Sequence, residues 1–136
     1  MSVGQAEEFY GPVLPVLEGK LGPVKGREAW EDIVEFMSGG RPSQCPKDKR
    51  DAPGSEKCIA LVYQGEDAVR KIRDVLGPTD PAKAPPGSIR KEFGQTIMIN
   101  AAHASDSAEN AKREMRIVQV DENNFKPLIE SFYARP

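Results

Sequence analysis

A single histidine stands in the part of the sequence whose residue types could do phosphoryl chemistry. His103 is the only histidine among the 136 residues, and it lies in the segment Asn-Ala-Ala-His-Ala-Ser-Asp-Ser at 100–107. The Ser-Asp-Ser run is typical of a helix N-terminus, and Glu109 falls in the first turn of the helix that it predicts. Backbone N–H groups at such an end attract anions. A lone histidine there is more often a capping or surface residue, but this one is placed where it could capture a phosphate and attack it.

Segment 100–107, with the helix sequence through Glu114 behind it, closely resembles the active-site segment of nucleoside diphosphate kinases. The resemblance implies that a nucleoside triphosphate phosphorylates His103, which then hands the phosphoryl group to a nucleoside diphosphate. It also implies that His103 and Glu114 are the catalytic pair, with Glu114 orienting the imidazole, and that Mg²⁺ is the cofactor, carried by the nucleotide phosphates. An imidazole suits such a relay because it is neutral and nucleophilic near neutral pH.

The resemblance also implies nucleotide contacts for six further residues. These are Tyr10 near the histidine, Arg27 at the opening of the next helix, Arg73 and Thr79 on the phosphates, Arg90 facing the terminal phosphate, and Asn100 on the sugar hydroxyl. Each of these residue types alone is ordinary on a protein surface, so it is their shared spacing with His103 that carries the resemblance. The match covers roughly 27–120 and is most specific over 58–118.

The fold that the resemblance implies is α+β, the ferredoxin-like fold of that family, lacking its first βαβ unit. The family's first strand ends in Lys-Pro-Asp-Gly, whose lysine reaches the transferring phosphates, and this motif does not occur in the sequence. Without that strand, the strands expected at 59–63 and 116–120 would expose unpaired backbone groups. Three arrangements fit: another chain supplies the unit, the N-terminal segment and tail rebuild the core, or the chain is a catalytically weak or inactive nucleotide-binding and oligomerising relative.

A second departure from the family lies at 27–30, which reads Arg-Glu-Ala-Trp where the family usually has Arg-Pro-Phe-Phe. Ala29 therefore stands where the family's base-stacking aromatic would be. The neighbouring Trp30 belongs instead to an apolar stripe of a core helix expected over 27–38 and ended by Gly39-Gly40. The full stripe is Trp30, Ile33, Val34 and Met37.

Apolar periodicity predicts the remaining elements. Helices are expected at the end of 1–10, over about 66–76, after Ser107, and over 124–133. The helix at 66–76 has an inner face of Val69, Ile72, Val75 and Leu76. A buried strand is expected at 58–63, a second strand at 116–120, and a turn at 121–124. Residues 11–26 are punctuated by glycine and proline. We interpret the whole chain, 1–136, as a single nucleoside diphosphate kinase-like domain.

Two loops interrupt this pattern. Residues 41–57 form a polar, lysine-rich insertion, and 77–92 form a proline-rich loop of a kind that the family packs at subunit contacts beside the nucleotide site. Cys45 and Cys58 flank the first loop. Two free thiols are the favoured interpretation, with a loop-stapling disulfide as the alternative.

Composition excludes some classes of partner and location. The net charge of −2 gives no hint of a nucleic-acid partner, and the sequence has neither an apolar run of membrane-spanning length nor a secretory signal at its start. We therefore expect a cytoplasmic homo-oligomer without membrane or specific nucleic-acid partners. The expected ligands are nucleoside di- and triphosphates, and the expected activity is nucleoside diphosphate kinase.

Overall fold

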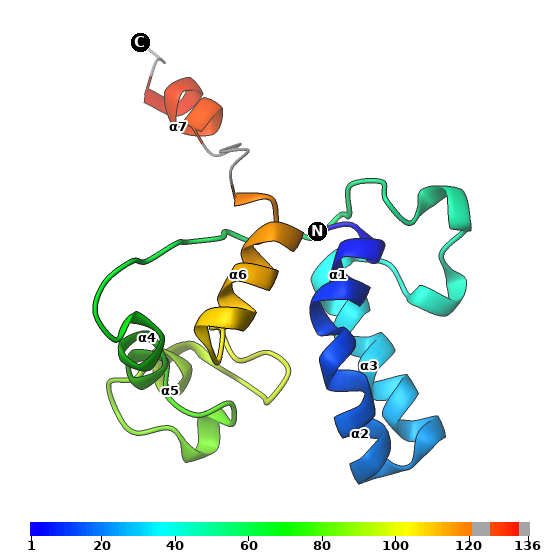
Figure 1. Ribbon diagram of the computed structural model, residues 1–136, viewed down its shortest axis with the longest axis horizontal. Helices are drawn as coiled ribbons and strands as arrows, with labels where there is room; N and C mark the ends of the chain where they lie inside the picture. Colours follow the sequence, from blue (N-terminus) through cyan, green and yellow to red (C-terminus); the bar gives the residue numbers. More distant parts are fainter. Residues whose placement is uncertain (121–125, 134–136) are drawn as a thin grey trace.

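The computed structural model describes residues 1–120 and 126–133, and within these ranges every regular element is helical. The α-helices are α1 (Val3–Tyr10), α2 (Leu14–Leu21), α3 (Pro23–Ser38), α4 (Ala68–Leu76), α5 (Ile89–Phe93), α6 (Ala108–Ile117) and α7 (Lys126–Tyr133). Short 3₁₀ turns lie at Gly11–Val13, Pro42–Gln44, Lys47–Lys49 and Pro81–Lys83. Figure 1 shows α1 and α2 end to end with α3 beside them, α4 and α5 together on the other side, α6 between these groups, and α7 apart from them.

The N-terminal helices pack around the chain's main apolar cluster. Val3 and Ala6 from α1 meet Trp30 and Val34 from α3, all with at most 6% of their surface exposed. The expected core helix at 27–38 and its termination by glycine are therefore confirmed, since α3 ends at Gly39 with φ of 79°, a left-handed value that glycine adopts without strain.

The segment 11–26 is more helical than its glycines and prolines predicted. Its prolines fall in the first turns of the 3₁₀ turn, α2 and α3, where a missing N–H costs nothing. Gly26 then lets α3 lie directly on α2, because a Cβ there would sit 2.5 Å from the backbone of Glu18. The segment therefore forms α2 and the start of an antiparallel α3, and it is not irregular.

Both expected strands are wrong for the described chain. Residues 58–63 are irregular and exposed, with Ile59 and Leu61 at 68% and 69% exposure, because no described segment offers their backbone a pairing partner. At 116–120 the chain instead continues α6 through Ile117, which is buried, and the N–H of Val118 donates to the carbonyl of Glu114. The expected turn at 121–124 lies outside the described residues.

The other expected helices form, with differences in where they begin and in which side chains they bury. α4 starts at Ala68, and of its expected inner face Leu76 is buried but Val75 is 59% exposed. α7 forms within the expected 124–133 range, with Phe132 exposed. No helix in the described ranges is long and apolar enough to cross a membrane.

The insertion at 41–57 is fastened to the N-terminal helices. The N–H of Gly4 donates to the carbonyl of Arg50 at 2.9 Å, and the N–H of Ser55 donates to the carbonyl of Ser38 at 3.0 Å. The Arg50 guanidinium also pairs with the Glu7 carboxylate on α1. Cys45, at one end of this loop, and Cys58, just beyond the other, are both free thiols.

Candidate active site

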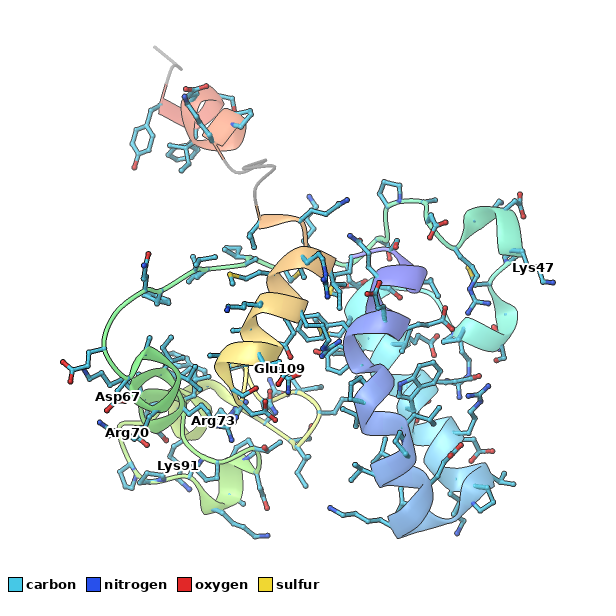
Figure 2. The ribbon with its side chains drawn as sticks, viewed as in Figure 1. Lys47, Asp67, Arg70, Arg73, Lys91 and Glu109 are labelled. Carbon is cyan, nitrogen blue, oxygen red and sulfur yellow. The ribbon has the colours of Figure 1, made fainter. Side chains whose placement is uncertain are left out.

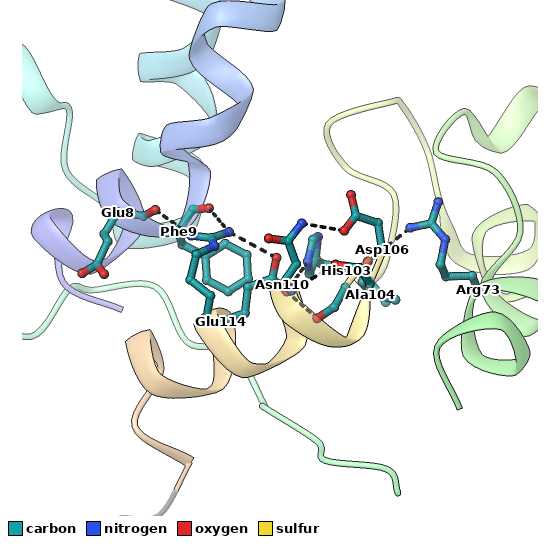
Figure 3. Close-up of polar contacts among 12 residues, drawn as sticks. Glu8, Phe9, Arg73, His103, Ala104, Asp106, Asn110 and Glu114 are labelled. Atoms are coloured by element: carbon teal, nitrogen blue, oxygen red, sulfur yellow. Dashed lines mark hydrogen bonds and ion pairs between the residues drawn. The ribbon is translucent and has the colours of Figure 1, made fainter. Parts of the chain in front are cut away.

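The site is built around the contact between the only histidine and a buried glutamate. His103 Nε2 lies 2.9 Å from Oε2 of Glu114, which is 8% exposed on the inner face of α6 (Figure 3). Ser107 caps this helix, since its hydroxyl accepts from the N–H of Asn110 at 3.0 Å. The cap therefore fixes where α6 begins, and Glu114 two turns later faces back toward the histidine segment.

Ser105 is a member of this cluster whose role the sequence did not reveal. Its hydroxyl donates to the same Glu114 oxygen at 2.5 Å, so one carboxylate oxygen serves both the serine and the imidazole. The Ser-Asp-Ser run indicated only a helix cap. No pattern in the sequence shows this contact, because it forms only when the segment before α6 folds back onto Glu114.

The geometry leaves one ring nitrogen of His103 available. Because an ionised carboxylate only accepts, Nε2 carries the proton in its bond to Glu114 and Nδ1 carries the lone pair. Within 1–120 and 126–133 no side chain or backbone group is hydrogen-bonded to Nδ1, and the His103 side chain is 43% exposed. The arrangement therefore presents an oriented imidazole, with a lone pair on Nδ1, to solvent.

Two aromatic rings from the end of α1 stand against the imidazole. The Phe9 ring centroid lies 5.1 Å from that of His103 at an interplanar angle of 73°, and the Tyr10 ring lies 6.3 Å away at 76°. Burial, followed by the negative charge of Glu114, raises the pKa of Tyr10 to about 12. The Tyr10 phenol is therefore neutral wherever the site would work, and it forms part of an edge-on aromatic wall.

Two arginines converge on the backbone at either side of His103. Arg90 is 9% exposed and donates from Nε and Nη2 to the carbonyl of Ala102 at 3.2 and 2.8 Å, and from Nη1 to that of Gly77 at 2.9 Å. Arg73 reaches the carbonyl of Ala104 at 3.5 Å. Figure 2 shows Arg73 on the side of α4 that faces α6, and Figure 3 shows it beside Ala104.

Neither arginine forms an ion pair with a carboxylate within the described ranges. Burial and the positive charge of Arg73 lower the pKa of Arg90. A buried guanidinium is costly unless an anion compensates its charge. The pair therefore forms a cationic region next to the histidine that suits a bound phosphate.

The loop before the histidine brings Asn100 and Thr79 together. Asn100 Nδ2 donates to the carbonyl of Ile97 at 2.9 Å and reaches that of Thr79 at 3.4 Å. The next residue, Ala101, has φ of 73°, a left-handed value that is strained for any residue with a Cβ. The chain thus turns sharply between Asn100 and His103.

Arg27 lies away from the residues that contact His103 in the described structure. Its guanidinium lies 5.5 Å from the centroid of the Trp30 ring, and it borders an open hollow with Glu18, Glu28 and Glu31. In the parts of the chain that the structure describes, no contact joins Arg27 to His103. The indole N–H of Trp30 instead donates to the carbonyl of Tyr10 at 2.9 Å, tying α3 to the aromatic wall.

The site's chemistry agrees with comparisons to known proteins. The family model described as nucleoside diphosphate kinase matches residues 4–123. Nucleoside diphosphate kinase 2 of Protochlamydia amoebophila is 42% identical over 98 residues, which are 72% of this chain and 57% of that protein. The nucleoside diphosphate kinase of Wolinella succinogenes is 43% identical over 115 residues, covering 85% of this chain and 64% of the relative.

A similar match is found with the nucleoside diphosphate kinase of Streptomyces avermitilis, 40% identical over 101 residues, or 74% of this chain and 62% of the relative. The chain therefore spans less than two thirds of the length of the curated relatives it matches. The family match itself extends over most of the chain, including every residue of the cluster around His103. On this evidence, the chain belongs to the nucleoside diphosphate kinase family.

Proposed function

We propose that this chain carries nucleoside diphosphate kinase activity, moving a phosphoryl group between nucleotides through phosphorylated His103. The observation that carries this proposal is the 2.9 Å contact between His103 Nε2 and Glu114, which leaves Nδ1 unengaged among the described residues. Two guanidinium groups bind the backbone carbonyls of the residues on either side of this histidine. That combination provides an aimed nucleophile and a cationic region, which are the main protein contributions that phosphoryl transfer needs.

In the first half-reaction, the Nδ1 lone pair attacks the terminal phosphorus of a nucleoside triphosphate. An N–P bond forms as the bond from that phosphorus to its bridging oxygen breaks, and the nucleoside diphosphate leaves with the electron pair. The imidazole becomes positively charged, and the Glu114 carboxylate on Nε2 stabilises that charge. In the second half-reaction a different nucleoside diphosphate attacks the phosphorus, which restores neutral His103.

The residues around His103 would hold the nucleotide. Arg73 and Arg90 would neutralise the phosphates, which is supported by their positions on the backbone beside His103 and by the absence of an ion-paired carboxylate on Arg90 in the described chain. Thr79 would contact phosphates, and Asn100, which shares a hydrogen bond with the Thr79 backbone, would bind the sugar hydroxyl. Tyr10 would border the site as part of the aromatic wall. Arg27 would have to leave the Trp30 ring to take part.

Mg²⁺ is proposed as a cofactor that arrives on the nucleotide phosphates, where it would neutralise phosphate charge. The donor chemistry of the site fits this role, because guanidinium groups surround the histidine and the described residues include no cluster of three histidine, cysteine or acidic side chains that could hold a metal ion. Ala29 has no aromatic ring on which a nucleotide base could stack, which supports low base specificity.

The wider setting is also a proposal. One family domain would span the chain, as the match over 4–123 supports, and it would work as a homo-oligomer in the cytoplasm, where the two free thiols would persist. The ferredoxin-like sheet of the family would form only when a further strand pairs with the chain, since the exposed apolar run at 58–63 has no described backbone partner.

The proposal is tested by following one phosphate through both half-reactions. The chain is incubated with Mg²⁺ and ATP labelled on its terminal phosphate, separated from nucleotide, and then given GDP. We expect label on the protein and its transfer to GTP, with neither step in His103→Ala. A wild-type chain that takes no label, or a His103→Ala variant that passes label to GDP, would contradict the proposal.

A further inference from the structure

We propose that Arg113 is a positioning residue for His103, and this inference rests on the proposed function of the same site. Arg113 precedes Glu114 on α6, yet its side chain is only 25% exposed. Its guanidinium reaches α1, where Nη1 donates to the carbonyl of Glu8 at 3.0 Å and Nη2 donates to that of Phe9 at 3.2 Å. Figure 3 shows Phe9 and Glu114 beside the histidine.

The Arg113 contacts fasten the end of α1 to α6. Carbonyl groups in the last turn of a helix favour a cation, and Glu8 and Phe9 lie in that turn of α1. Phe9 is also the residue whose ring stands 5.1 Å from the imidazole. By holding the Phe9 backbone, Arg113 sets where the aromatic wall meets His103.

The same guanidinium faces the free side of the Glu114 carboxylate. Arg113 Nη2 lies 3.5 Å from Oε1 of Glu114, while Oε2 binds His103 and Ser105. The carboxylate is therefore approached from both of its oxygens, which restricts its rotation. One side chain thus constrains two groups that contact the imidazole, the carboxylate directly and the aromatic wall through backbone.

A purely structural role explains the burial of this side chain poorly. Its Nε is buried without a hydrogen-bond partner in the described structure, which is a cost that a non-polar residue would avoid. In the described structure, the other two nitrogens of the guanidinium bind the two α1 carbonyls and approach Glu114. What offsets the cost of the unpaired Nε is therefore the placement of the groups that contact His103.

The test compares Arg113→Met with Arg116→Met. Arg116 lies on the same helix and is exposed, and the described structure gives its side chain no hydrogen bond or ion pair, so it controls for the loss of one positive charge from α6. Two readouts are used: the NMR signals of the His103 ring, which are unambiguous because the chain has one histidine, and kcat and KM for phosphoryl transfer.

We expect Arg113→Met to move the His103 ring-proton signals toward those of a histidine in an unfolded peptide, since the Phe9 ring no longer shields them. We expect kcat to fall about 10- to 100-fold with KM changed far less, as misplacement of a reacting group predicts. Arg116→Met should match the wild type in both. Ring signals that stay unchanged in Arg113→Met, or that move equally in both variants, overturn the proposal.

The two readouts separate this inference from the proposed function. If the wild-type chain transfers no phosphate, the proposed function fails, while the NMR comparison still decides whether Arg113 positions the ring. If Arg113→Met does not fold, Arg113→Lys replaces it, because a lysine keeps the charge but cannot span three acceptors. Its ring signals should move in the same direction by less, and unchanged signals contradict the proposal.

Discussion

Among the residues that the structure describes, His103 is held through one of its two ring nitrogens, and that asymmetry is the main chemical fact at the scale of residues. The Glu114 carboxylate occupies Nε2, and Ser105 shares the same oxygen. A carboxylate in this position selects the tautomer of the neutral ring. The guanidinium of Arg90, buried without an ion-paired carboxylate in the described chain, binds the carbonyl of Ala102 and so favours an anion near the histidine segment.

Tyr10 gives this site a measurable dependence on pH. Its folded-state pKa of about 12 lies above the ordinary value of 10.0, so folding favours the protonated phenol. The stability this contributes is fully present below about pH 10 and is lost as pH rises toward 12. Between pH 9 and pH 11 the free energy of unfolding should fall by about 1 kcal/mol from this group alone.

Urea unfolding at several pH values measures this loss. Tyr10→Phe should remove that part of the slope, while Tyr63→Phe, which changes a tyrosine that is 63% exposed, should keep it. Equal slopes in wild type and Tyr10→Phe would show that the Tyr10 phenol does not occupy the buried position next to Glu114.

At the scale of elements, the site depends on how closely helices approach one another. α3 holds the end of α1 through the bond from Trp30 to the Tyr10 carbonyl, and α1 in turn supplies the rings beside His103. The α2–α3 contact supports this arrangement through Gly26, where a Cβ would lie 2.5 Å from Glu18 backbone atoms. Packing far from the histidine therefore helps to set its aromatic wall.

Two glycine substitutions test this contact. Gly26→Ala forces backbone apart and should lower the free energy of unfolding by about 2 kcal/mol or more. Gly19→Ala is the matched control, because a Cβ at Gly19 in α2 meets nothing within 4 Å, and it should raise stability by about 0.5–1 kcal/mol through helix propensity. Chemical unfolding of both variants measures the difference, and a Gly26→Ala chain as stable as the wild type would refute the close contact.

Elements with their own local signal could be predicted from the sequence. The stripe containing Trp30 and Val34 gives α3 its buried face, and the Ser107 cap gives α6 its start, since both patterns are complete within one helix. The apolar run at 58–63 carries no such information, because whether it becomes a strand depends on a partner elsewhere. At 116–120 the β-branched residues also suggested a strand, but burial of Ile117 on α6 outweighs that preference.

At the scale of the whole molecule, the site lies where separate helical groups meet. α6 stands between α1 on one side and α4 with α5 on the other (Figure 1), and the histidine segment runs into its N-terminus. Arg73 from α4 and Arg90 from α5 approach this segment from one side, while Phe9 and Tyr10 approach from the other. Of the residues that the resemblance singled out, Tyr10, Arg73, Arg90 and Glu114 contact His103 or the residues beside it, whereas Arg27 contacts Trp30.

The remaining site contacts could not be predicted, because they depend on tertiary approach. The Ser-Asp-Ser run indicated only a helix cap, so the bond from Ser105 to Glu114 is seen only in the folded chain. The contacts of Arg113 with the Phe9 backbone likewise depend on the closeness of α1 to α6. Arg27 shows the converse, since its position in sequence matches a family residue while its contact is with Trp30.

The most direct test of the central claim is to determine which nitrogen of His103 becomes phosphorylated. The wild-type chain is treated with ATP and Mg²⁺, and the phosphohistidine isomer is identified by NMR or by isomer-specific antibodies, with Glu114→Gln for comparison. Because Glu114 occupies Nε2, we expect phosphate on Nδ1 alone, and slower labelling in the variant. Phosphate on Nε2, or no phosphohistidine at all, would contradict the account.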